Sequence, residues 1–239
     1  MRIKNFIILT SIAVLSAILV SSASAFVPSA PTNKLSYSAK IMIRSKAYLK
    51  PGFNHRYKGV IETHTSWSRG PQNLLVLNSR VVKNTVWIKL RLGERPNSAA
   101  AWIPAGRTIV KKNYWRVEVR RNRHLVTVFK RGHKVLRFKA VLGAPSTPTP
   151  KGNFAIYEKI PQQPRDGFVG PWALHLTAHS NVLDNYGGGP GRVAIHGRDG
   201  ASFADPLGTS RSHGCIRINN RRVIYLADRL PLGTPVRIR

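Results

Sequence analysis

The stretch RVAIHGRDGASFADPLGTSRSHGCIRINN spans residues 192–220 and contains Cys215, the only cysteine in a chain of 239 residues. The short apolar run RVAI, bounded by turn residues, is typical of a β-strand, and His196 stands at its end. A polar, glycine-containing loop of fifteen residues then leads to Ser212 and the triplet His-Gly-Cys. The stretch therefore predicts a strand and a returning loop that together bring His196 to the cysteine.

A lone thiol can act as a nucleophile only when its proton is removed. An ordinary cysteine, with a pKa of about 8.5, is mostly protonated at neutral pH, and the thiolate is the reactive form. Two histidines are candidates for the base: His213, two residues before Cys215, and His196, on another strand. If Cys215 lies on a strand, His213 points to the same face. Spacing alone leaves open which histidine is the main base.

Gly214 separates His213 from Cys215. A glycine lets the backbone approach a substrate without a Cβ in the way, so we expect the amides of Gly214 and Cys215 to stabilise an oxyanion. The structural alternatives for the cysteine are an inert buried thiol or an intermolecular disulfide.

These motifs resemble the catalytic domain of bacterial L,D-transpeptidases, whose pattern is a histidine, a gap of similar length, then Ser or Thr followed by His-Gly-Cys. The resemblance covers about Tyr114 to Arg239 and includes TPTPKGNF at 147–154 and LGTPV at 232–236. One position departs from some members: Arg217 stands where they have Asn. We expect Arg217 to bind a substrate carboxylate.

The resemblance implies roles for individual residues. Cys215 would be the nucleophile and His196 its base, oriented by the backbone carbonyl of Gly197. The oxyanion site would come from His213, Gly214 and Cys215. The implied partners are peptidoglycan stem peptides: the thiolate attacks the carbonyl of the third residue, a diamino acid, and expels the terminal D-Ala.

The resulting thioester has two possible fates. Attack by the side-chain amine of a neighbouring stem gives a crosslink between third residues, and attack by water makes the enzyme an L,D-carboxypeptidase. The resemblance implies neither a metal nor another cofactor. Carbapenem-type β-lactams mimic the acyl donor and are expected to acylate Cys215.

Other polar and aromatic residues have two readings each. Ser212 either donates a hydrogen bond in the site or caps a turn, and Trp172 and Tyr186 either pack on substrate or stabilise the groove itself. We expect the remaining nearby histidines to be structural or exposed: His124, His133, His175 and His179.

Two other classes of function stay open. His and Cys with a carboxylate also bind zinc, so the site could be a metal centre formed by His196, His213, Cys215 and either Asp199 or Asp205. The protein could instead be a non-catalytic wall-binding module. The complete His-Gly-Cys triplet with its upstream histidine favours the enzyme.

Residues 1–25 predict a secretory signal peptide and hence an extracytoplasmic, wall-associated protein. Arg2 and Lys4 precede the apolar segment 6–20, and Ala-Ser-Ala at 23–25 is a small-residue cleavage site. An uncleaved membrane anchor is the alternative, although the apolar segment is short for a spanning helix. No later segment predicts a transmembrane span.

The chain is strongly basic, with 39 Lys and Arg against 9 Asp and Glu and a net charge of +30. Such a field attracts polyanions, and outside the cell we expect anionic wall polymers and phospholipid head groups. High charge also serves solubility alone. The basic residues are scattered and no nucleic-acid-binding motif is present, so we expect no nucleic-acid partner.

The sequence predicts a mainly β chain of two domains after a linker at 26–38. About five short strands in 39–112 fit a small antiparallel barrel, and WIKLRLGERPNSAAAWIPAG at 87–106 resembles bacterial SH3-like domains. In Thr85 to Leu92 the alternation places Val86, Ile88, Leu90 and Leu92 on the buried face, with Trp87 on the other.

Residues 113–239 predict the β-rich catalytic domain. Three strands with turns near 121–122 and 131–132 come first, and a strand covers 154–157. The glycine- and proline-rich segment 160–191 is expected to be a long loop bordering the site. Asn219 is a predicted N-cap for one helix over 220–229, and 231–238 forms a closing strand. The helix's predicted apolar face is Val223, Ile224, Leu226, Ala227 and Leu230.

Overall fold

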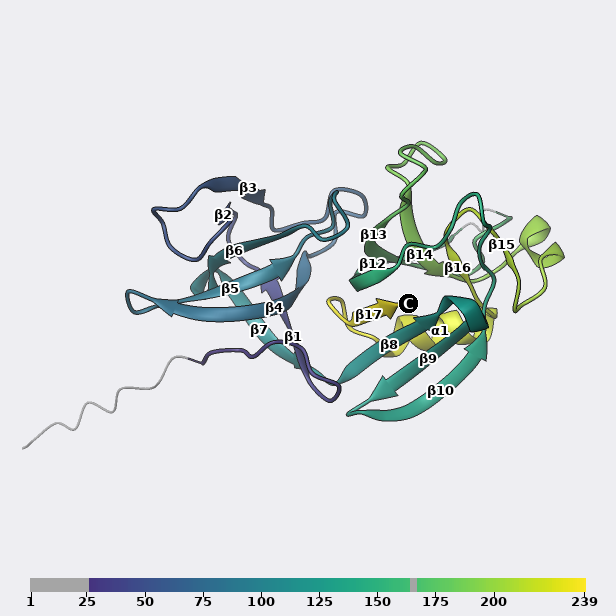
Figure 1. Ribbon diagram of the computed structural model, residues 1–239, viewed down its shortest axis with the longest axis horizontal. Helices are drawn as coiled ribbons and strands as arrows, with labels where there is room; N and C mark the ends of the chain where they lie inside the picture. Colours follow the sequence, from purple (N-terminus) through teal and green to yellow (C-terminus); the bar gives the residue numbers. More distant parts are fainter. Residues whose placement is uncertain (1–25, 164–166) are drawn as a thin grey trace, which may run out of the picture.

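The computed structural model describes residues 26–163 and 167–239, so the predicted signal peptide lies outside the described residues. The chain forms two β-sheet units side by side, the N-terminal unit in purple to blue and the C-terminal unit in teal to yellow (Figure 1). Each unit has a separate buried core. The protein is therefore mainly β, as the sequence predicts.

The N-terminal unit is a seven-stranded sheet with the order β3-β2-β6-β5-β4-β1-β7, and all its pairs are antiparallel. The sequence predicted about five strands; the turns divide the same β-rich runs into more, shorter pieces. The strands are β1 Ser36–Ile41, β2 Ser45–Tyr48, β3 Tyr57–Ile61, β4 Asn73–Val82, β5 Thr85–Arg91, β6 Ala100–Pro104 and β7 Thr108–Asn113.

Both faces of β5 are buried in part. Ile88 and Leu90 are fully buried, as the alternation predicts. The prediction was wrong for Trp87, which is only 1% exposed on the opposite face. Tyr48 and Phe53 pack edge-on against its ring at centroid distances of 5.5 and 4.9 Å. The alternation of residues within β5 could not predict this aromatic cluster, because the partners of Trp87 come from other segments of the chain.

The expected boundaries of the N-terminal unit shift slightly. β1 begins at Ser36, inside the predicted linker, and Phe26 packs on Tyr37 at 5.4 Å between ring centroids. β7 ends at Asn113, whose side-chain amide donates to the Thr234 hydroxyl of the other unit at 3.0 Å. The predicted linker therefore contacts the sheet near both of its ends, while most of the residues between them are exposed.

The C-terminal unit is an eight-stranded sheet with the order β10-β9-β8-β17-β12-β13-β14-β16. β8–β17 and β14–β16 pair in parallel, and the other neighbours are antiparallel. A parallel pair of short strands, β11 and β15, lies beside it. The strands are β8 Trp115–Arg120, β9 Leu125–Lys130, β10 His133–Lys139, β11 Leu142–Gly143, β12 Gly152–Pro161, β13 Trp172–His179, β14 Arg192–His196, β15 Ser210–Ser212, β16 Ile216–Arg217 and β17 Pro235–Ile238.

One α-helix, α1 (Asn220–Arg229), covers part of this sheet, and Asn219 caps it by accepting a hydrogen bond from the Arg221 amide at 2.9 Å. Helix and cap confirm the prediction. Val223, Leu226, Ala227 and Leu230 join the core, whereas Ile224 is 41% exposed and does not belong to the buried face.

The segment 160–191 is not one long loop. β12 extends to Pro161, and β13, Trp172–His179, is an interior strand between β12 and β14. Leu174 and Leu176 are fully buried on it. The glycines and prolines that suggested a loop flank this strand on both sides rather than interrupting it.

The two units contact each other through side chains of β12. Tyr157 belongs to the buried core of the N-terminal sheet and donates from its hydroxyl to Gln72 Oε1 at 3.1 Å. Glu158 accepts hydrogen bonds from Ser68, on the loop between β3 and β4. No helix in the part of the chain that the structure describes is long and apolar enough to cross a bilayer.

Candidate active site

Cys215 lies in the turn between β15 and β16, not on a strand. Gly214 has a φ of +115°, a conformation that favours glycine. The Ser212 hydroxyl donates to the Cys215 carbonyl at 2.6 Å and accepts from the Gly214 amide at 3.2 Å. Ser212 therefore caps the turn that presents the thiol. The Gly214 amide, expected in the oxyanion site, is engaged within this turn.

His196 ends β14 and is buried, with 4% of its surface exposed. Its Nδ1 lies 2.8 Å from the carbonyl oxygen of Gly197 and 3.4 Å from that of Val169. Carbonyl oxygens only accept, so Nδ1 carries the proton and Nε2 is left with a free lone pair. Burial lowers the pKa of His196 to about 4, so the ring is neutral at pH 7.

The pairing of β14 with β16 brings the two predicted reactive residues together. Ile195 and His196 pair with Ile216 and Arg217, so Cys215, directly before β16, lies beside β14. Cys215 and His196 line the same cavity, which has a volume of about 410 Å³.

The thiol is uncharged in the resting site. Burial raises the pKa of Cys215, and a hydrogen bond with the Ala194 backbone and the charge of Arg217 only partly oppose this effect. At neutral pH the site therefore holds a neutral thiol beside a neutral imidazole, not a preformed thiolate.

His213 occupies a different environment from His196. It is exposed, its Nδ1 lies 3.2 Å from the Tyr186 hydroxyl, and the two rings pack with centroids 5.1 Å apart. Both residues line the cavity, so Tyr186 borders the site as the sequence suggested. Of the two histidines, only His196 has a tautomer fixed by carbonyl oxygens, which favours it as the base.

Arg217 does not offer a free charge to a substrate carboxylate. It is 3% exposed, its Nη1 lies 2.6 Å from Asp205 Oδ2, and its guanidinium stacks on Phe168 at 4.6 Å. Asp205 already neutralises the arginine, which disfavours the predicted contact with a substrate carboxylate. Arg217 instead forms part of the floor of the cavity.

Trp172 does not line the cavity. Its ring packs against the core of the C-terminal sheet, and its backbone carbonyl accepts from the Gly197 amide at 3.3 Å. The second reading of Trp172, packing within the protein, is the one the structure shows. Gly197 contributes through its backbone to the orientation of His196.

Among the cavity-wall residues that sequence reasoning did not single out, three carry charge, an imidazole or a large aromatic ring: Trp67, Glu158 and His175. His175 was expected to be structural or exposed, yet it lies on β13 facing the cavity. Burial lowers its pKa to about 4. His175 was missed because β13 was taken for loop, and the other two meet only through contact between the units.

The zinc alternative lacks a ligand cluster. Among residues 26–163 and 167–239, no group of three or more His, Cys, Asp or Glu side chains is placed to hold a metal ion. Asp199 caps the short 3-10 turn Gly200–Ala204, and Asp205 pairs with Arg217.

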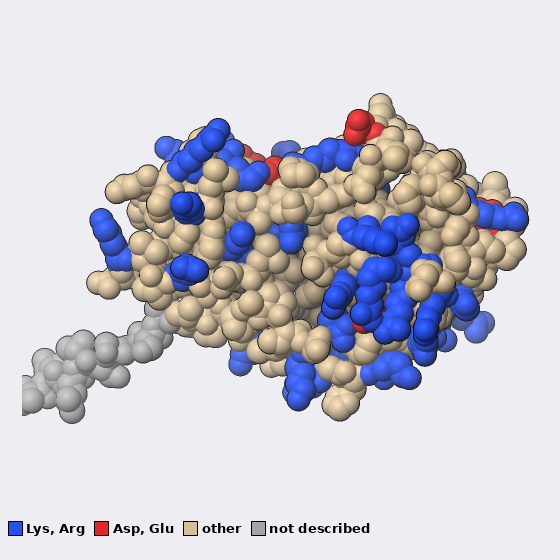
Figure 2. All heavy atoms as spheres, viewed as in Figure 1, with Lys and Arg blue, Asp and Glu red and all other residues tan. Residues whose placement is uncertain are grey.

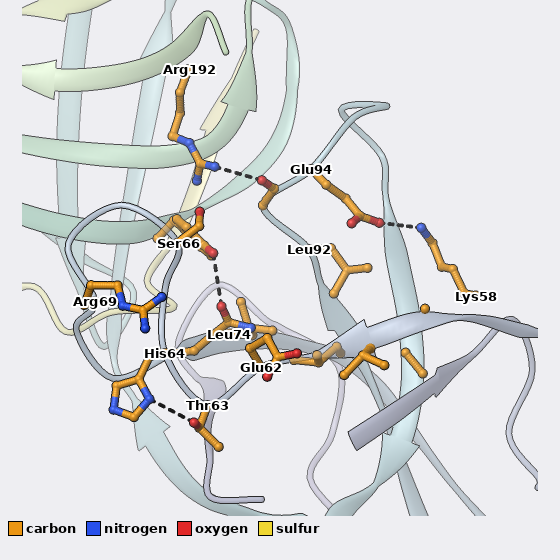
Figure 3. Close-up of a pocket in the computed structure, with 17 residues that line it drawn as sticks. Lys58, Glu62, Thr63, His64, Ser66, Arg69, Leu74, Leu92, Glu94 and Arg192 are labelled. Atoms are coloured by element: carbon orange, nitrogen blue, oxygen red, sulfur yellow. Dashed lines mark hydrogen bonds and ion pairs between the residues drawn. The ribbon is translucent and has the colours of Figure 1, made fainter. Parts of the chain in front are cut away.

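A second cavity, of about 590 Å³, lies between the two units (Figure 3). Its walls include His64, Ser66 and Arg69 of the β3–β4 loop, and the Lys58–Glu94 ion pair, 2.5 Å long, crosses one side. Arg192 reaches in from β14 and donates to the Gly93 carbonyl at 3.1 Å. The β3–β4 loop contributes to both this cavity and the one that holds Cys215, and Arg192 lines both of them.

Curated relatives match about half of the chain. The YkuD protein of Bacillus licheniformis is 32% identical over 124 residues, which are 52% of this chain and 65% of that protein. L,D-transpeptidase 1 of Mycobacterium tuberculosis is 28% identical over 127 residues, 48% of this chain and 46% of that protein. The chain thus spans less than two thirds of the length of either relative.

A solved structure shows a partial likeness. The catalytic domain of the E. faecium L,D-transpeptidase is 23% identical with a TM-score of 0.38, and the match covers 52% of this chain and 95% of that one. The YkuD family, described as the L,D-transpeptidase catalytic domain, matches residues 114–238. This range begins directly after β7 and contains the whole C-terminal sheet, with His196 and Cys215. The chain therefore belongs to the YkuD family of L,D-transpeptidase catalytic domains.

Proposed function

We propose that this protein is a peptidoglycan L,D-transpeptidase that carries an acyl group on Cys215. The observation that carries the proposal is the arrangement of His196 and Cys215 in one cavity, with the imidazole held in the tautomer that accepts a proton at Nε2. Membership of the YkuD family supports the same reaction.

In the first half-reaction, the Cys215 proton passes to His196 Nε2 as sulfur attacks the carbonyl carbon of the third stem residue. The tetrahedral intermediate collapses by breaking the bond to D-Ala, whose nitrogen takes the proton from His196. A thioester and free D-Ala result. The raised pKa of the thiol and the lowered pKa of the histidine mean that proton transfer accompanies attack and does not precede it.

In the second half-reaction, the side-chain amine of a neighbouring stem attacks the thioester and gives its proton to His196. The carbon–sulfur bond breaks, the sulfur regains the proton, and a crosslink between two third residues forms. Water in place of the amine would give L,D-carboxypeptidase activity, the second candidate, because the same base activates either nucleophile.

Two measurements test the proposal. The intact protein incubated with a carbapenem should gain the mass of one acyl group on Cys215, and Cys215→Ala should gain none. Reaction with tetrapeptide-containing sacculi, followed by muropeptide digestion, should give third-to-third crosslinks. Tripeptides without crosslinks would assign carboxypeptidase activity instead, and an unmodified protein in both assays would favour a non-catalytic wall-binding module.

We further propose that the protein is exported by residues 1–25 and that the N-terminal sheet is an SH3-like module that holds the enzyme on the wall. The antiparallel arrangement and separate core of that sheet support a module of this kind. Detection of the mature N-terminus near residue 26 in the extracellular fraction would test export. Pull-down of the intact protein with purified sacculi, before and after exposed-residue substitutions on β3, would test wall binding.

Basic side chains gather over the part of the C-terminal unit that holds β8 and β9 (Figure 2). A groove of about 680 Å³ there is lined by Arg120, Arg121, Arg123, Lys151 and Arg239. We propose that it contacts anionic wall polymers, because guanidinium groups bind phosphate and carboxylate in pairs of hydrogen bonds. Retention on a polyanion column that weakens with salt, and weakens further in Arg121→Gln/Arg123→Gln, would support this contact.

A further inference from the structure

We propose that Glu158 and Trp67 bind the side-chain ammonium of the diamino acid in the acyl donor. This inference rests on the proposed transpeptidase function and names the part of the substrate that the Cys215 cavity selects. It assigns a substrate-binding residue of the reaction to the N-terminal unit.

Glu158 is a buried carboxylate in the wall of the reactive cavity. It lies on β12 and is 2% exposed. Its Oε1 accepts hydrogen bonds from the Ser68 amide and the Ser68 hydroxyl, each at 3.0 Å. Burial opposes its ionisation, but hydrogen bonds from Thr65 and Ser68 and the charge of Arg192 lower its pKa below the ordinary value. The group is therefore an anion at neutral pH.

This anion has no paired cation in the part of the chain that the structure describes. No Lys, Arg or His nitrogen of those residues lies within 4.0 Å of its carboxylate oxygens. Arg192 acts on it only at longer range, because its guanidinium stacks on Tyr157 at 4.4 Å and donates to Gly93. A buried charge without a partner is costly, and a bound cation would offset that cost.

Trp67 provides the second half of an ammonium site. It precedes Ser68 in the β3–β4 loop, is 59% exposed, and lines the same cavity as Glu158. Its ring packs against Gly189: a Cβ added there would lie 3.2 Å from the ring. An ammonium ion binds well over the face of a tryptophan, and best where a carboxylate is near.

The sheet register connects this site to the thiol. Glu158 pairs with His175 on β13, and His175 pairs with Ala194 on β14, so the three side chains share one face. Two strand spacings separate Glu158 from Ala194, about 10 Å, and the Ala194 backbone hydrogen-bonds the Cys215 thiol. An extended diamino acid side chain suits such a separation.

His175 stands between the two ends of this row. Its pKa of about 4 keeps it neutral at pH 7, so it does not repel a cation passing over it. A carboxylate also holds a nearby amine in its protonated form. An attacking amine must be neutral, so the site suits the donor's spectator ammonium and not the acceptor's nucleophile.

The test compares two acyl donors with the intact protein. One is a tetrapeptide stem whose third residue is lysine or diaminopimelate, whichever is the better donor, and the other has norleucine there. D-Ala release gives kcat and KM for each. We expect wild type to favour the amine-bearing donor by about 10- to 100-fold in kcat/KM, the effect of a hydrogen bond to a charged group. Glu158→Gln should abolish this preference, mainly by raising KM for the amine-bearing donor.

Control variants distinguish recognition of the ammonium group from an effect on the structure of the β3–β4 loop. Ser68→Ala removes one of the hydrogen bonds that hold the Glu158 carboxylate, so it should weaken the preference without abolishing it. Glu94→Gln makes the same chemical change as Glu158→Gln in the other cavity and should keep the preference. Trp67→Phe should keep more of it than Trp67→Ala. Equal kcat/KM for the two donors in wild type, or a preference that persists in Glu158→Gln, would overturn the inference while leaving the reaction intact. Wild type that releases no D-Ala from any donor or from sacculi contradicts the proposed function itself.

Discussion

His196 donates from Nδ1 to the carbonyl oxygen of Gly197, its own neighbour, across 2.8 Å. The acceptor belongs to the backbone, so no side-chain substitution can remove it while residue 197 stays in place. A Cβ at position 197 would lie 2.4 Å from Asn220 Oδ1 and 2.9 Å from Pro171 Cδ, so any larger residue there would displace its neighbours. Because a backbone carbonyl orients the imidazole, the fold itself determines which tautomer His196 adopts.

His196→Gln should abolish most of the activity and leave the thiol in place. Loss of a positioned general base costs about 10²- to 10⁴-fold in rate. D-Ala release by the variant should fall by that factor, while a thiol titration under denaturing conditions still finds one group per chain. A loss below tenfold would move the base role to His213, to be checked with His213→Gln.

The Cys215 thiol should react slowly with alkylating agents at neutral pH. Burial raises its pKa, so the thiolate fraction is small at pH 7 and increases only as the pH rises past the ordinary cysteine value. Iodoacetamide labelling followed by mass spectrometry from pH 6 to 10 measures this. Fast labelling that is already constant at pH 7 would show a preformed thiolate and contradict the neutral resting state.

The folded protein should lose stability between about pH 6.5 and 4. His175, His179 and His196 each have a pKa lowered from 6.5 to about 4, by burial above all. The unfolded chain takes up these protons first, so stability is complete above pH 6.5 and falls as the pH drops toward 4. For the buried His196 alone the upper limit is on the order of 3 kcal/mol.

Thermal unfolding at several pH values checks this dependence. His196→Gln should flatten the decline, whereas a substitution of the exposed His133 should leave it as steep as in wild type. A melting temperature that does not change between pH 6.5 and 4 would contradict the assignment of buried neutral histidines.

Asp205→Asn should destabilise the protein by about 3 to 5 kcal/mol, because it leaves Arg217 buried without its counter-charge. Arg217→Met combined with Asp205→Asn should be less destabilised than the single change, since the unpaired charge is gone. Denaturant unfolding of the three variants measures both effects. Equal stability of wild type and Asp205→Asn would show that the pair is solvated.

Gly214→Ala should reduce activity more than stability. A Cβ on Gly214 would make only ordinary contacts, at 3.7 and 3.8 Å from the Thr147 and Pro148 carbonyl oxygens, but the φ of +115° is strained for any other residue, at a cost of about 1 to 3 kcal/mol. Relaxation of that strain would displace the adjacent Cys215. D-Ala release and thermal unfolding, measured together, distinguish displacement of the thiol from general unfolding.

The sequence predicted the parts of the site that are local in the chain. The strand ending at His196, the motif around Cys215 and the helix capped by Asn219 each have signals within a few residues. The sequence analysis did not predict β13, because the strand is only eight residues long and the glycines and prolines on both sides of it indicate a loop. Trp87 was misplaced because its partners come from β2 and the loop after it.

The charge state and the wall of the cavity could not be predicted. Arg217 was expected to be free because Asp205, twelve residues away, gives no sign in the sequence that it pairs with it. Ser68 and Glu158 are ninety residues apart and meet only because the two units dock. Contacts of that kind depend on how distant segments pack in three dimensions, and local sequence patterns do not predict them.

Tyr157 is part of a strand of the C-terminal sheet, yet it fills a place in the interior of the N-terminal one. The core of the N-terminal unit is thus completed by a ring from the C-terminal unit and is not complete alone. Heating should melt the two units in a single step, and a chimaera that replaces the first half with a foreign one must supply a matching hole for this ring.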